Sequence, residues 1–544
     1  MLLEIDLTDS VSLPEGGLKA FSTPDDGPAV LLTRQQGRVQ AFAAHCPHYG
    51  APLEKGKIVA GKLICPWHHA CFRVESGHLC EPPALDDLPT FAVREAEGRI
   101  WVKLPHNTPA STDKPDATST AEVGGTPPAP AAAPADARTF VIIGGGAAGQ
   151  FAAQTLRREG FEGRLVMASA DEAAPYDRTK LSKAYLAGKA KPAALPLRQP
   201  EFYRQQRIEL LTNTPATGLD LASQEIHFEN HPPLRYDQLL LALGGKPNTL
   251  PKLVGHDLPG VFTLRTQADA NAILEATKEA KQVVVIGSSF IGMEAASSLI
   301  SETRQVTVVA HGKVPFERML GPEIGQMFRR LHEEKGVHFE IEAEVTALLG
   351  EGGHVSGVQL KTGRILPAEA VVLGVGVSPA TDFLRNILDL GKDGSVPVDA
   401  QLRAAENVYA AGDIARFPLA SDGALTRIEH WRLAQQHGQV AARNMLGQQA
   451  EFKAAPFFWT QQYGKSLRYA GHAEKWDEII CYGEVAKQDF LAFYILNGLV
   501  AAVAGMGRDT AMIYITELLG QNKLPPSADL NPETDWATLA GNAG

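Results

Sequence analysis

The chain has 544 residues, far more than one hydrophobic core organises, so three or four domains are expected. Its 44% hydrophobic and 21% charged residues are typical of a globular α/β enzyme and exclude a disordered or fibrous protein. With 51 Lys and Arg against 62 Asp and Glu, the net charge is −11, which argues against nucleic acid or an anionic membrane as a partner.

The chain starts without the basic and apolar segments of a secretory leader, and no apolar run reaches the ~18 residues of a spanning helix. Residues 1–105 hold short β-like runs between Gly and Pro turns and predict a small all-β domain. Residues 106–137 are rich in Pro, Ala, Thr and Asp and predict a semi-extended linker. We therefore expect a cytoplasmic protein with a tethered N-terminal domain.

Four of the five cysteines lie in this first domain, and two of them belong to a paired motif. Cys46 is followed by His48, and Cys65 is followed by His68, so each of two loops offers one thiolate and one imidazole. This pairing is typical of a Rieske [2Fe-2S] centre, in which two Cys hold one iron and two His hold the other. Zinc is the alternative, but finger-type sites usually pair Cys with Cys and His with His.

Two further features of the first domain concern the potential of the cluster and the role of the other cysteines. High-potential Rieske proteins carry an extra Cys in each ligand loop, and the two form a disulfide, whereas this chain has Ala51 and Trp67 at those places. A lower potential range is therefore expected. Cys71 and Cys80 are interpreted as small thiols without a role in the site.

A dinucleotide-binding pattern follows the linker. The apolar run 140–143 leads into Gly144-Gly-Gly146-Ala-Ala148-Gly149 and then into a helical stretch, which is the order of a βαβ unit. The glycines let backbone N–H groups approach a pyrophosphate, whose charge the helix N-terminus favours. Asp171 lies 22 residues beyond Gly149, where a carboxylate should hold the adenosine ribose.

The same pattern recurs about 143 residues later, where the run 283–286 precedes Gly287-Ser-Ser289-Phe-Ile-Gly292. Ser289 replaces the middle glycine, which is tolerable if the pyrophosphate lies slightly farther from the backbone. Two such openings predict two dinucleotide-binding domains, because the interval is far too long for a solenoid repeat. From about residue 456, aromatic residues alternate with polar ones and predict an antiparallel sheet.

Five further segments identify the first dinucleotide as FAD by resemblance. They resemble the flavin-binding and second FAD motifs of the ferredoxin-reductase and apoptosis-inducing-factor flavoproteins: 175–183, 236–247, 374–379, 409–413 and 429–431. The chain departs from the family at Leu243 and Ala404, where Thr is usual. The likeness covers about 138–520. With the Rieske motif, it indicates the Rieske-containing apoptosis-inducing-factor-like subgroup of the pyridine nucleotide-disulfide oxidoreductase superfamily.

The resemblance implies a multidomain fold with an all-β Rieske domain, two Rossmann-like α/β domains and a C-terminal α+β domain. The expected boundaries are 1–105 for the Rieske domain, 106–137 for the linker, 138–254 and 376–450 for the FAD domain, 255–375 for the NAD(P) domain, 451–525 for the C-terminal domain and 526–544 for a tail.

By the same resemblance, Arg178 and Lys183 contact the flavin, and Lys183 pairs with Glu294. These last two are the candidate catalytic residues, since a cation near the isoalloxazine favours the anionic reduced form. Asp413 would bind the ribityl chain. Trp459 is either a nicotinamide contact or part of the core. The candidate cofactor-binding residues are Gly144, Gly146, Ala148, Gly149, Asp171, Arg178, Lys183, Gly287, Ser289, Gly292, Glu294, Arg318, Gly376, Asp413, Glu429, His430, Trp431 and Trp459.

The choice of nicotinamide dinucleotide depends on the strand predicted at 306–309. The acid that holds the adenosine ribose in NADH enzymes should follow this strand, but the sequence there is Ala310-His311-Gly312. His311, Lys313 or Arg318 could meet a 2′-phosphate, although no clear Arg clamp is present. NADH is favoured only slightly over NADPH.

The outlet for the electrons follows from the cysteine positions. No Cys lies between 81 and 480, so thiol–disulfide exchange beside the flavin is excluded. We expect an NAD(P)H-dependent FAD oxidoreductase that reduces its own cluster and then an unidentified acceptor, such as a redox protein or an oxygenase, with the linker allowing the domain to reach it. Two alternatives stay open: a slow redox-gated interaction protein, and a reductase of radicals or quinones with the cluster as a sensor. A monomer or homodimer is expected, without nucleic acid or membrane partners.

Overall fold

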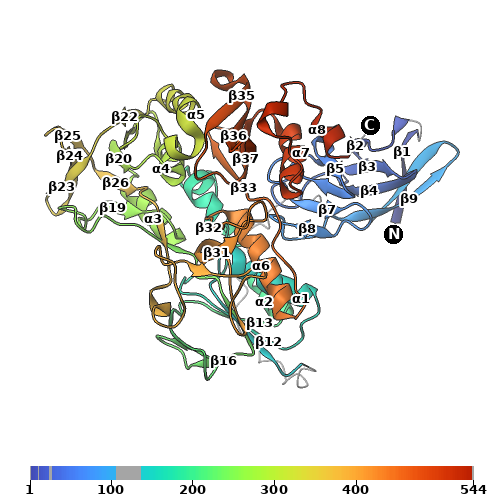
Figure 1. The fold of residues 1–544 in the computed structure, drawn as a ribbon, viewed down its shortest axis with the longest axis horizontal. Helices are drawn as coiled ribbons and strands as arrows, with labels where there is room; N and C mark the ends of the chain where they lie inside the picture. Colours follow the sequence, from blue (N-terminus) through green and yellow to red (C-terminus); the bar gives the residue numbers. More distant parts are fainter. Residues whose placement is uncertain (1, 10–11, 24–26, 106–135, 542–544) are drawn as a thin grey trace.

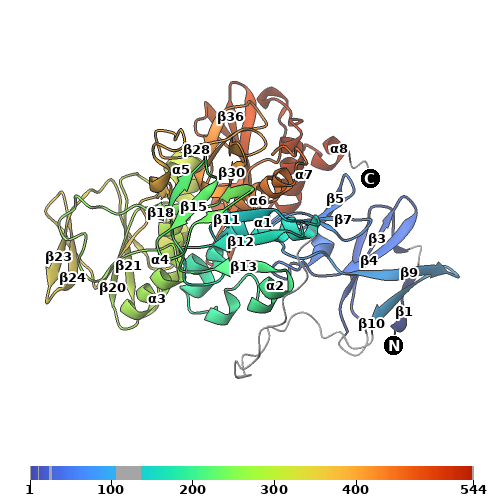
Figure 2. The same cartoon turned by 90° about the horizontal axis from the view of Figure 1, so that it is seen from below.

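The computed structural model describes residues 2–9, 12–23, 27–105 and 136–541. The expected linker at 106–137 lies almost wholly outside this range. Figures 1 and 2 show the N-terminal β domain at one end, the second dinucleotide domain at the other, and the C-terminal sheet between them. Within the described ranges, no helix is both long and apolar enough to cross a membrane.

The N-terminal domain consists of two antiparallel sheets that share one apolar core, and the larger sheet also forms a second apolar cluster of its own. The larger sheet has the order β1 (Leu2–Asp9), β10 (Arg99–Pro105), β9 (Thr90–Ala96), β4 (Arg38–Ala43), β3 (Val30–Gln35) and β2 (Leu18–Phe21). The smaller has the order β5 (Lys57–Val59), β6 (Lys62–Ile64), β7 (Cys71–Arg73) and β8 (Leu79–Glu81). One ligand loop precedes β5 and the other joins β6 to β7, so the smaller sheet positions both.

The first dinucleotide domain is a mainly parallel sheet, because apolar runs such as 140–143 are buried on both faces. Its strand order is β13 (Ile208–Leu211), β12 (Arg164–Ala168), β11 (Thr139–Ile143), β17 (Gln238–Leu241), β30 (Val408–Ala410) and β29 (Arg403–Ala405). The associated helices are α1 (Ala147–Arg158), α2 (Pro200–Gln205) and α6 (Trp431–Met445). The chain leaves this domain after β17, and Leu384, Val396 and Val398 already belong to its core again before β29.

The second dinucleotide domain is inserted between those two parts. Its sheet is wholly parallel, in the order β19 (Val261–Thr263), β26 (Ala370–Leu373), β20 (Gln282–Ile286), β21 (Gln305–Val309) and β22 (His338–Glu340). Its helices are α3 (Gln267–Ala276), α4 (Phe290–Leu299) and α5 (Glu317–Glu333). Both predicted glycine motifs therefore lie between a central strand and a helix.

The C-terminal domain is an antiparallel sheet covered by α7 (Asp509–Gly520), which confirms the predicted sheet. Its strand order is β33 (Phe457–Gln462), β34 (Lys465–Gly471), β37 (Leu499–Met506), β36 (Asp489–Leu496) and β35 (Glu478–Glu484). The expected tail needs a correction. Helix α8 (Trp536–Leu539) places Trp536 against Phe493, with only 8% of its surface exposed, so this segment completes the domain core.

The accessory sheets are β14 (Ala216–Asp220), β15 (Glu225–Phe228) and β16 (Leu234–Arg235); β18 (Gly245–Pro247) and β27 (Val377–Pro379); β23 (Val345–Glu351), β24 (His354–Leu360) and β25 (Ile365–Pro367); and β28 (Val396–Pro397), β31 (Ala415–Pro418) and β32 (Leu425–Arg427).

Candidate functional site

The two ligand loops of the N-terminal domain are closed in the same way. The Cys46 N–H donates to the Ala51 carbonyl and the Cys65 N–H donates to the Ala70 carbonyl, both at 2.9 Å. Each bond spans five residues and holds its cysteine at the base of a tight loop. Both cysteines are buried, and their thiols are within hydrogen-bonding contact of each other. The fold therefore brings together the two thiol ligands that the sequence predicts.

The two predicted histidine ligands converge beside the cysteines. His48 Nδ1 lies 3.2 Å from His68 Nδ1, so both rings aim the same nitrogen at one point. Desolvation by the surrounding protein lowers the pKa of His48 to about 4 and holds the pKa of His68 well below its usual range. Both imidazoles are therefore neutral at pH 7, which is the form that binds a metal. One thiol pair and one imidazole pair fit the two irons of a Rieske cluster.

A large cavity lies between the two dinucleotide domains and β33. Its volume is about 1330 Å³. The first glycine motif forms one wall: Gly144 has φ +117°, and a Cβ there would lie 2.1 Å from the Ala242 carbonyl oxygen. Gly146 begins α1 without a side-chain cap, which leaves the helix N–H groups for a pyrophosphate. His430 also lines the cavity, and its buried Nδ1 has no protein partner. These features fit FAD.

Most predicted cofactor residues line this cavity, and they are Gly144, Gly146, Ala148, Asp171, Arg178, Lys183, Ser289, Glu294, Gly376, Asp413, Glu429, His430, Trp431 and Trp459. Gly149 and Gly292 do not, because each packs on the carbonyl of the first glycine of its motif. Gly287 packs against Gly374. Arg318 is exposed and lies outside the lining, so the structure does not bring it to this cavity.

The two candidate catalytic residues form an ion pair in the cavity wall. Lys183 Nζ lies 2.7 Å from Glu294 Oε2, which also accepts a hydrogen bond from Ser182 at 2.5 Å. Thr460 donates to the other carboxylate oxygen at 2.7 Å. Glu294 is 3% exposed, so its charge is satisfied by protein groups and not by water. The resemblance predicts this pair but neither hydroxyl donor: Ser182 is the neighbour of Lys183, and Thr460 lies in a distant segment.

Two predicted carboxylates already have cationic partners. Asp171 accepts hydrogen bonds from Tyr176 at 2.7 Å and from Arg178 at 3.0 Å. Asp413 forms a 2.6 Å ion pair with Arg265. Arg265 lines the cavity and is missed by sequence reasoning, because it follows a short strand without any motif.

Strand β33 connects the cavity to the Rieske loops. Side chains of a strand alternate between its faces, so Phe457 and Trp459 point one way while Thr460 points the other. Phe457 stacks on His69 with ring centroids 4.1 Å apart. Trp459 lines the cavity and also contacts His68, with centroids 4.2 Å apart. The ring of Trp459 therefore borders both the cavity and the predicted ligand His68.

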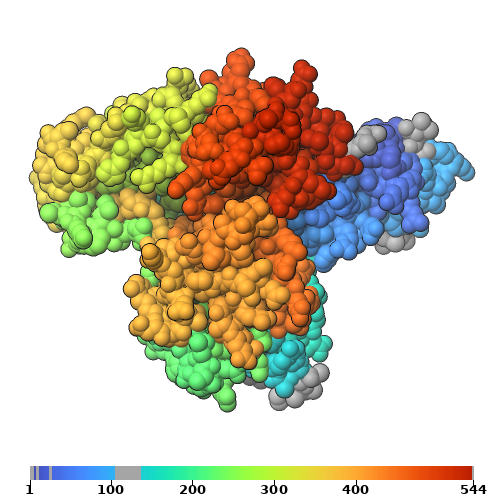
Figure 3. Space-filling model, viewed as in Figure 1, coloured from blue at the N-terminus to red at the C-terminus, as the bar shows by residue number. Residues whose placement is uncertain are grey.

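The Rieske domain is packed against the rest of the protein through apolar contacts. Val59, Ile64 and Cys71 belong to the core of the C-terminal domain, and the first two are at most 1% exposed. Phe151 of α1 belongs to the core of the Rieske domain. Figure 3 shows the blue N-terminal domain directly against the red C-terminal domain. Separating the domains would expose these side chains to water.

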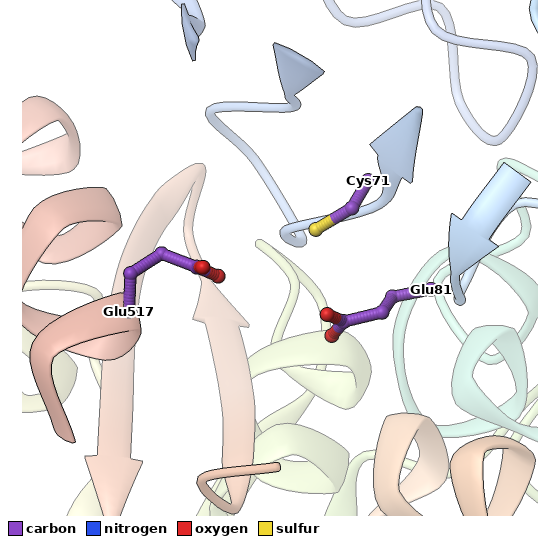
Figure 4. Close-up of side chains that lie close together, drawn as sticks. All are labelled: Cys71, Glu81 and Glu517. Atoms are coloured by element: carbon purple, nitrogen blue, oxygen red, sulfur yellow. The ribbon is translucent and has the colours of Figure 1, made fainter. Parts of the chain in front are cut away.

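A group of charged residues lies in the same interface. Figure 4 shows Cys71, Glu81 and Glu517 directed toward one another from different elements. Two cations balance the two carboxylates: Arg432 is 2.7 Å from Glu81, and Lys62 is 3.1 Å from Glu81 and 3.8 Å from Glu517. Burial and the adjacent Glu81 charge raise the pKa of Cys71 well above its usual range, so the thiol stays protonated. This arrangement is an ion-pair network and lacks the character of a metal site.

Comparisons with known proteins agree with this architecture. Residues 5–92 match the Rieske [2Fe-2S] domain, 138–438 the Pyridine nucleotide-disulphide oxidoreductase family, and 457–540 the Reductase C-terminal family. The chain is similar to apoptosis-inducing factor 3 of Mus musculus, with 38% identity over 91% of this chain and 80% of that protein. It is also similar to the biphenyl dioxygenase system ferredoxin--NAD(+) reductase component of Paraburkholderia xenovorans, with 33% identity over 70% of this chain and 93% of that protein.

Among solved structures, the covalent putidaredoxin reductase–putidaredoxin complex superposes with a TM-score of 0.70 and 30% identity, covering 74% of this chain and 98% of the matched chain. These matches confirm the expected fold class and the expected FAD-dependent NAD(P)H oxidoreductase. The chain belongs to the pyridine nucleotide-disulphide oxidoreductase family, in a form that carries its own Rieske [2Fe-2S] domain.

Proposed function

We propose that this protein takes electrons from a nicotinamide dinucleotide at the FAD cavity, passes them singly to its own Rieske cluster, and delivers them to a separate redox protein or oxygenase. The observation that carries the proposal is the position of Trp459, which lines the cavity and packs on the cluster ligand His68. Bound FAD supplies the conversion of a two-electron donor into single-electron steps. The protein contributes the short path between the two centres.

The residues around the cavity would bind the cofactor and tune its reduction. The first glycine motif and the N-terminus of α1 would hold the pyrophosphate. Lys183 and Glu294 would border the isoalloxazine, where the ammonium group favours the anionic reduced form. Burial and the nearby Asp413 charge raise the pKa of Glu429, which also forms an ion pair with Arg427. Each of these residues positions or tunes the cofactor.

NADH is the proposed donor. The similar protein from Paraburkholderia xenovorans is named a ferredoxin--NAD(+) reductase component of a dioxygenase system. That name also supports a separate redox protein or an oxygenase as the final acceptor.

An anaerobic titration of the holoprotein tests the proposal. NADH, and NADPH in a parallel sample, are added stepwise while flavin absorbance and the EPR signal of the cluster are recorded. We expect the flavin to bleach and the Rieske signal to grow in step, with NADH effective at the lower concentration. A flavin that bleaches while the cluster stays oxidised would refute internal transfer and favour a reductase whose Rieske domain serves as a sensor.

Replacement of Trp459 by Ala tests the path itself. The ring fills the space between cavity and cluster, so we expect the rate of cluster reduction to fall about tenfold or more, equivalent to about 1.4 kcal/mol in barrier height. Flavin reduction by NADH should persist. Stopped-flow absorbance separates the two steps. Trp459→Phe should retain most of the rate, and Trp476→Phe, outside the cavity lining, is the matched control. Equal cluster-reduction rates in Trp459→Ala and wild type would contradict the role of Trp459.

A further inference from the structure

A chain of hydrogen bonds leads from Glu294 into the protein, away from Lys183. Thr460 Oγ1 lies 2.7 Å from Glu294 Oε1, and Gln462 Nε2 lies 3.2 Å from Thr460 Oγ1. His332 Nε2 lies 2.6 Å from Gln462 Oε1, and the Tyr463 hydroxyl lies 3.1 Å from His332 Nδ1. Thr460, Gln462 and His332 are each at most 1% exposed. The chain thus connects the FAD cavity to α5 and to the turn after β33.

The direction of every bond in this chain follows from the first. An ionised Glu294 can only accept, so the Thr460 hydroxyl donates to it and accepts from the Gln462 amide N–H. The Gln462 oxygen then faces His332, whose Nε2 must carry the proton. The Nδ1 lone pair of that ring is left to accept from the Tyr463 hydroxyl. All four donors therefore point toward Glu294.

The protonation states of the two distal residues agree with this orientation. Burial lowers the pKa of His332 to about 4, so the ring is neutral at pH 7 and has one donor and one acceptor nitrogen. Burial also raises the pKa of Tyr463, so its hydroxyl keeps the proton that it donates. The hydrogen bonds between Tyr463 and Glu294 therefore keep their direction without a second cation beside them.

We propose that the Thr460, Gln462, His332 and Tyr463 side chains, here called the Glu294 relay, are positioning residues that stabilise Glu294 as an anion and limit its pull on the Lys183 ammonium. Aligned hydrogen bonds polarise one another in a low-dielectric interior, so their stabilisation of the terminal charge is cooperative. Without the relay, the carboxylate charge is shared by Lys183 and Ser182 alone. The inference rests on the proposed function in placing Lys183 and Glu294 beside the flavin.

The test replaces Thr460 by Val, which keeps the shape of the side chain and removes its donor. The equilibrium constant for flavin reduction is read from flavin absorbance of the holoprotein in defined NADH/NAD⁺ mixtures. Without the Thr460 donor, Glu294 should draw the Lys183 ammonium closer. The reduced flavin should then lose part of the electrostatic stabilisation that this ammonium provides. We expect this constant to fall about 3- to 10-fold, the net worth of one ordinary hydrogen bond, because only part of the change at Glu294 reaches the flavin. Thr460→Ser, which retains the hydroxyl, should match wild type.

Tyr463→Phe tests the far end of the relay without touching the cavity. A cooperative chain predicts a shift of the same sign but smaller size, about twofold, whereas Tyr482→Phe on β35 should have no effect. An unchanged or increased constant in Thr460→Val overturns the inference, provided that FAD content and thermal unfolding match Thr460→Ser. The same samples give the cluster EPR signal, so failure of internal electron transfer is recorded separately from failure of the relay.

Discussion

Replacement of Arg432 by Ala is expected to destabilise the docked position of the Rieske domain by about 3 kcal/mol, because Glu81 loses one of its two cationic partners and two buried backbone carbonyls lose a charged donor. Arg432 is 2% exposed. It donates to the Glu81 carboxylate at 2.7 Å and to the backbone carbonyls of Pro82 at 2.9 Å and His69 at 3.1 Å. One side chain thus satisfies three acceptors of the Rieske domain, two of which are carbonyls of the buried residues Pro82 and His69.

The effect of this variant is read in two ways. Cluster reduction by NADH should slow strongly while flavin reduction continues, and hydrogen exchange in β7 and β8 should accelerate. Arg443→Ala on the same helix is the matched control, since Arg443 forms only a surface pair with Glu159 at 3.1 Å and such pairs contribute less than about 1 kcal/mol. Removing both charges in Arg432→Met/Glu81→Gln should recover part of the loss. Wild-type exchange and transfer in Arg432→Ala would show that apolar contacts alone fix the domain.

Replacement of His68 by Ala is expected to abolish the Rieske EPR signal. One iron of the cluster would lose one of its two protein ligands. The neighbouring imidazoles cannot replace it, because His69 is buried against Phe457 and His45 is exposed and precedes Cys46. Flavin absorbance and flavin reduction by NADH should be unchanged. The iron content, the EPR spectrum and the rate of NADH oxidation measure the three consequences separately.

His45→Ala is the control for this experiment, because it removes an imidazole next to Cys46 of the other ligand loop without removing a predicted ligand. It should retain both the signal and the transfer. If His68→Ala keeps a Rieske-type signal, the assignment of the second imidazole ligand fails. Persistent reduction of an external carrier by His68→Ala would instead show that the flavin delivers electrons without the cluster.

Sequence by itself determined those features that depend on short spacings. The Cys–His pairs of the two loops and the glycine motifs are local patterns, because a tight loop or a strand–turn–helix needs particular residue types within a few positions. The alternation of aromatic and polar residues after 456 likewise predicted the antiparallel sheet. The resemblance to flavoproteins supplied the Lys183–Glu294 pair. The composition of 526–544 predicts a tail and does not reveal that Trp536 completes a core.

Only the tertiary structure decided how the cluster, cavity and interface meet. Trp459 reaches both the cavity and His68, Thr460 reaches Glu294 across 166 positions, and Arg432 reaches Glu81 across 351. Contacts over such separations depend on which faces of different domains pack together. Local propensity and periodicity carry no information about that choice, because it is set by the shape and charge of surfaces assembled from many distant segments.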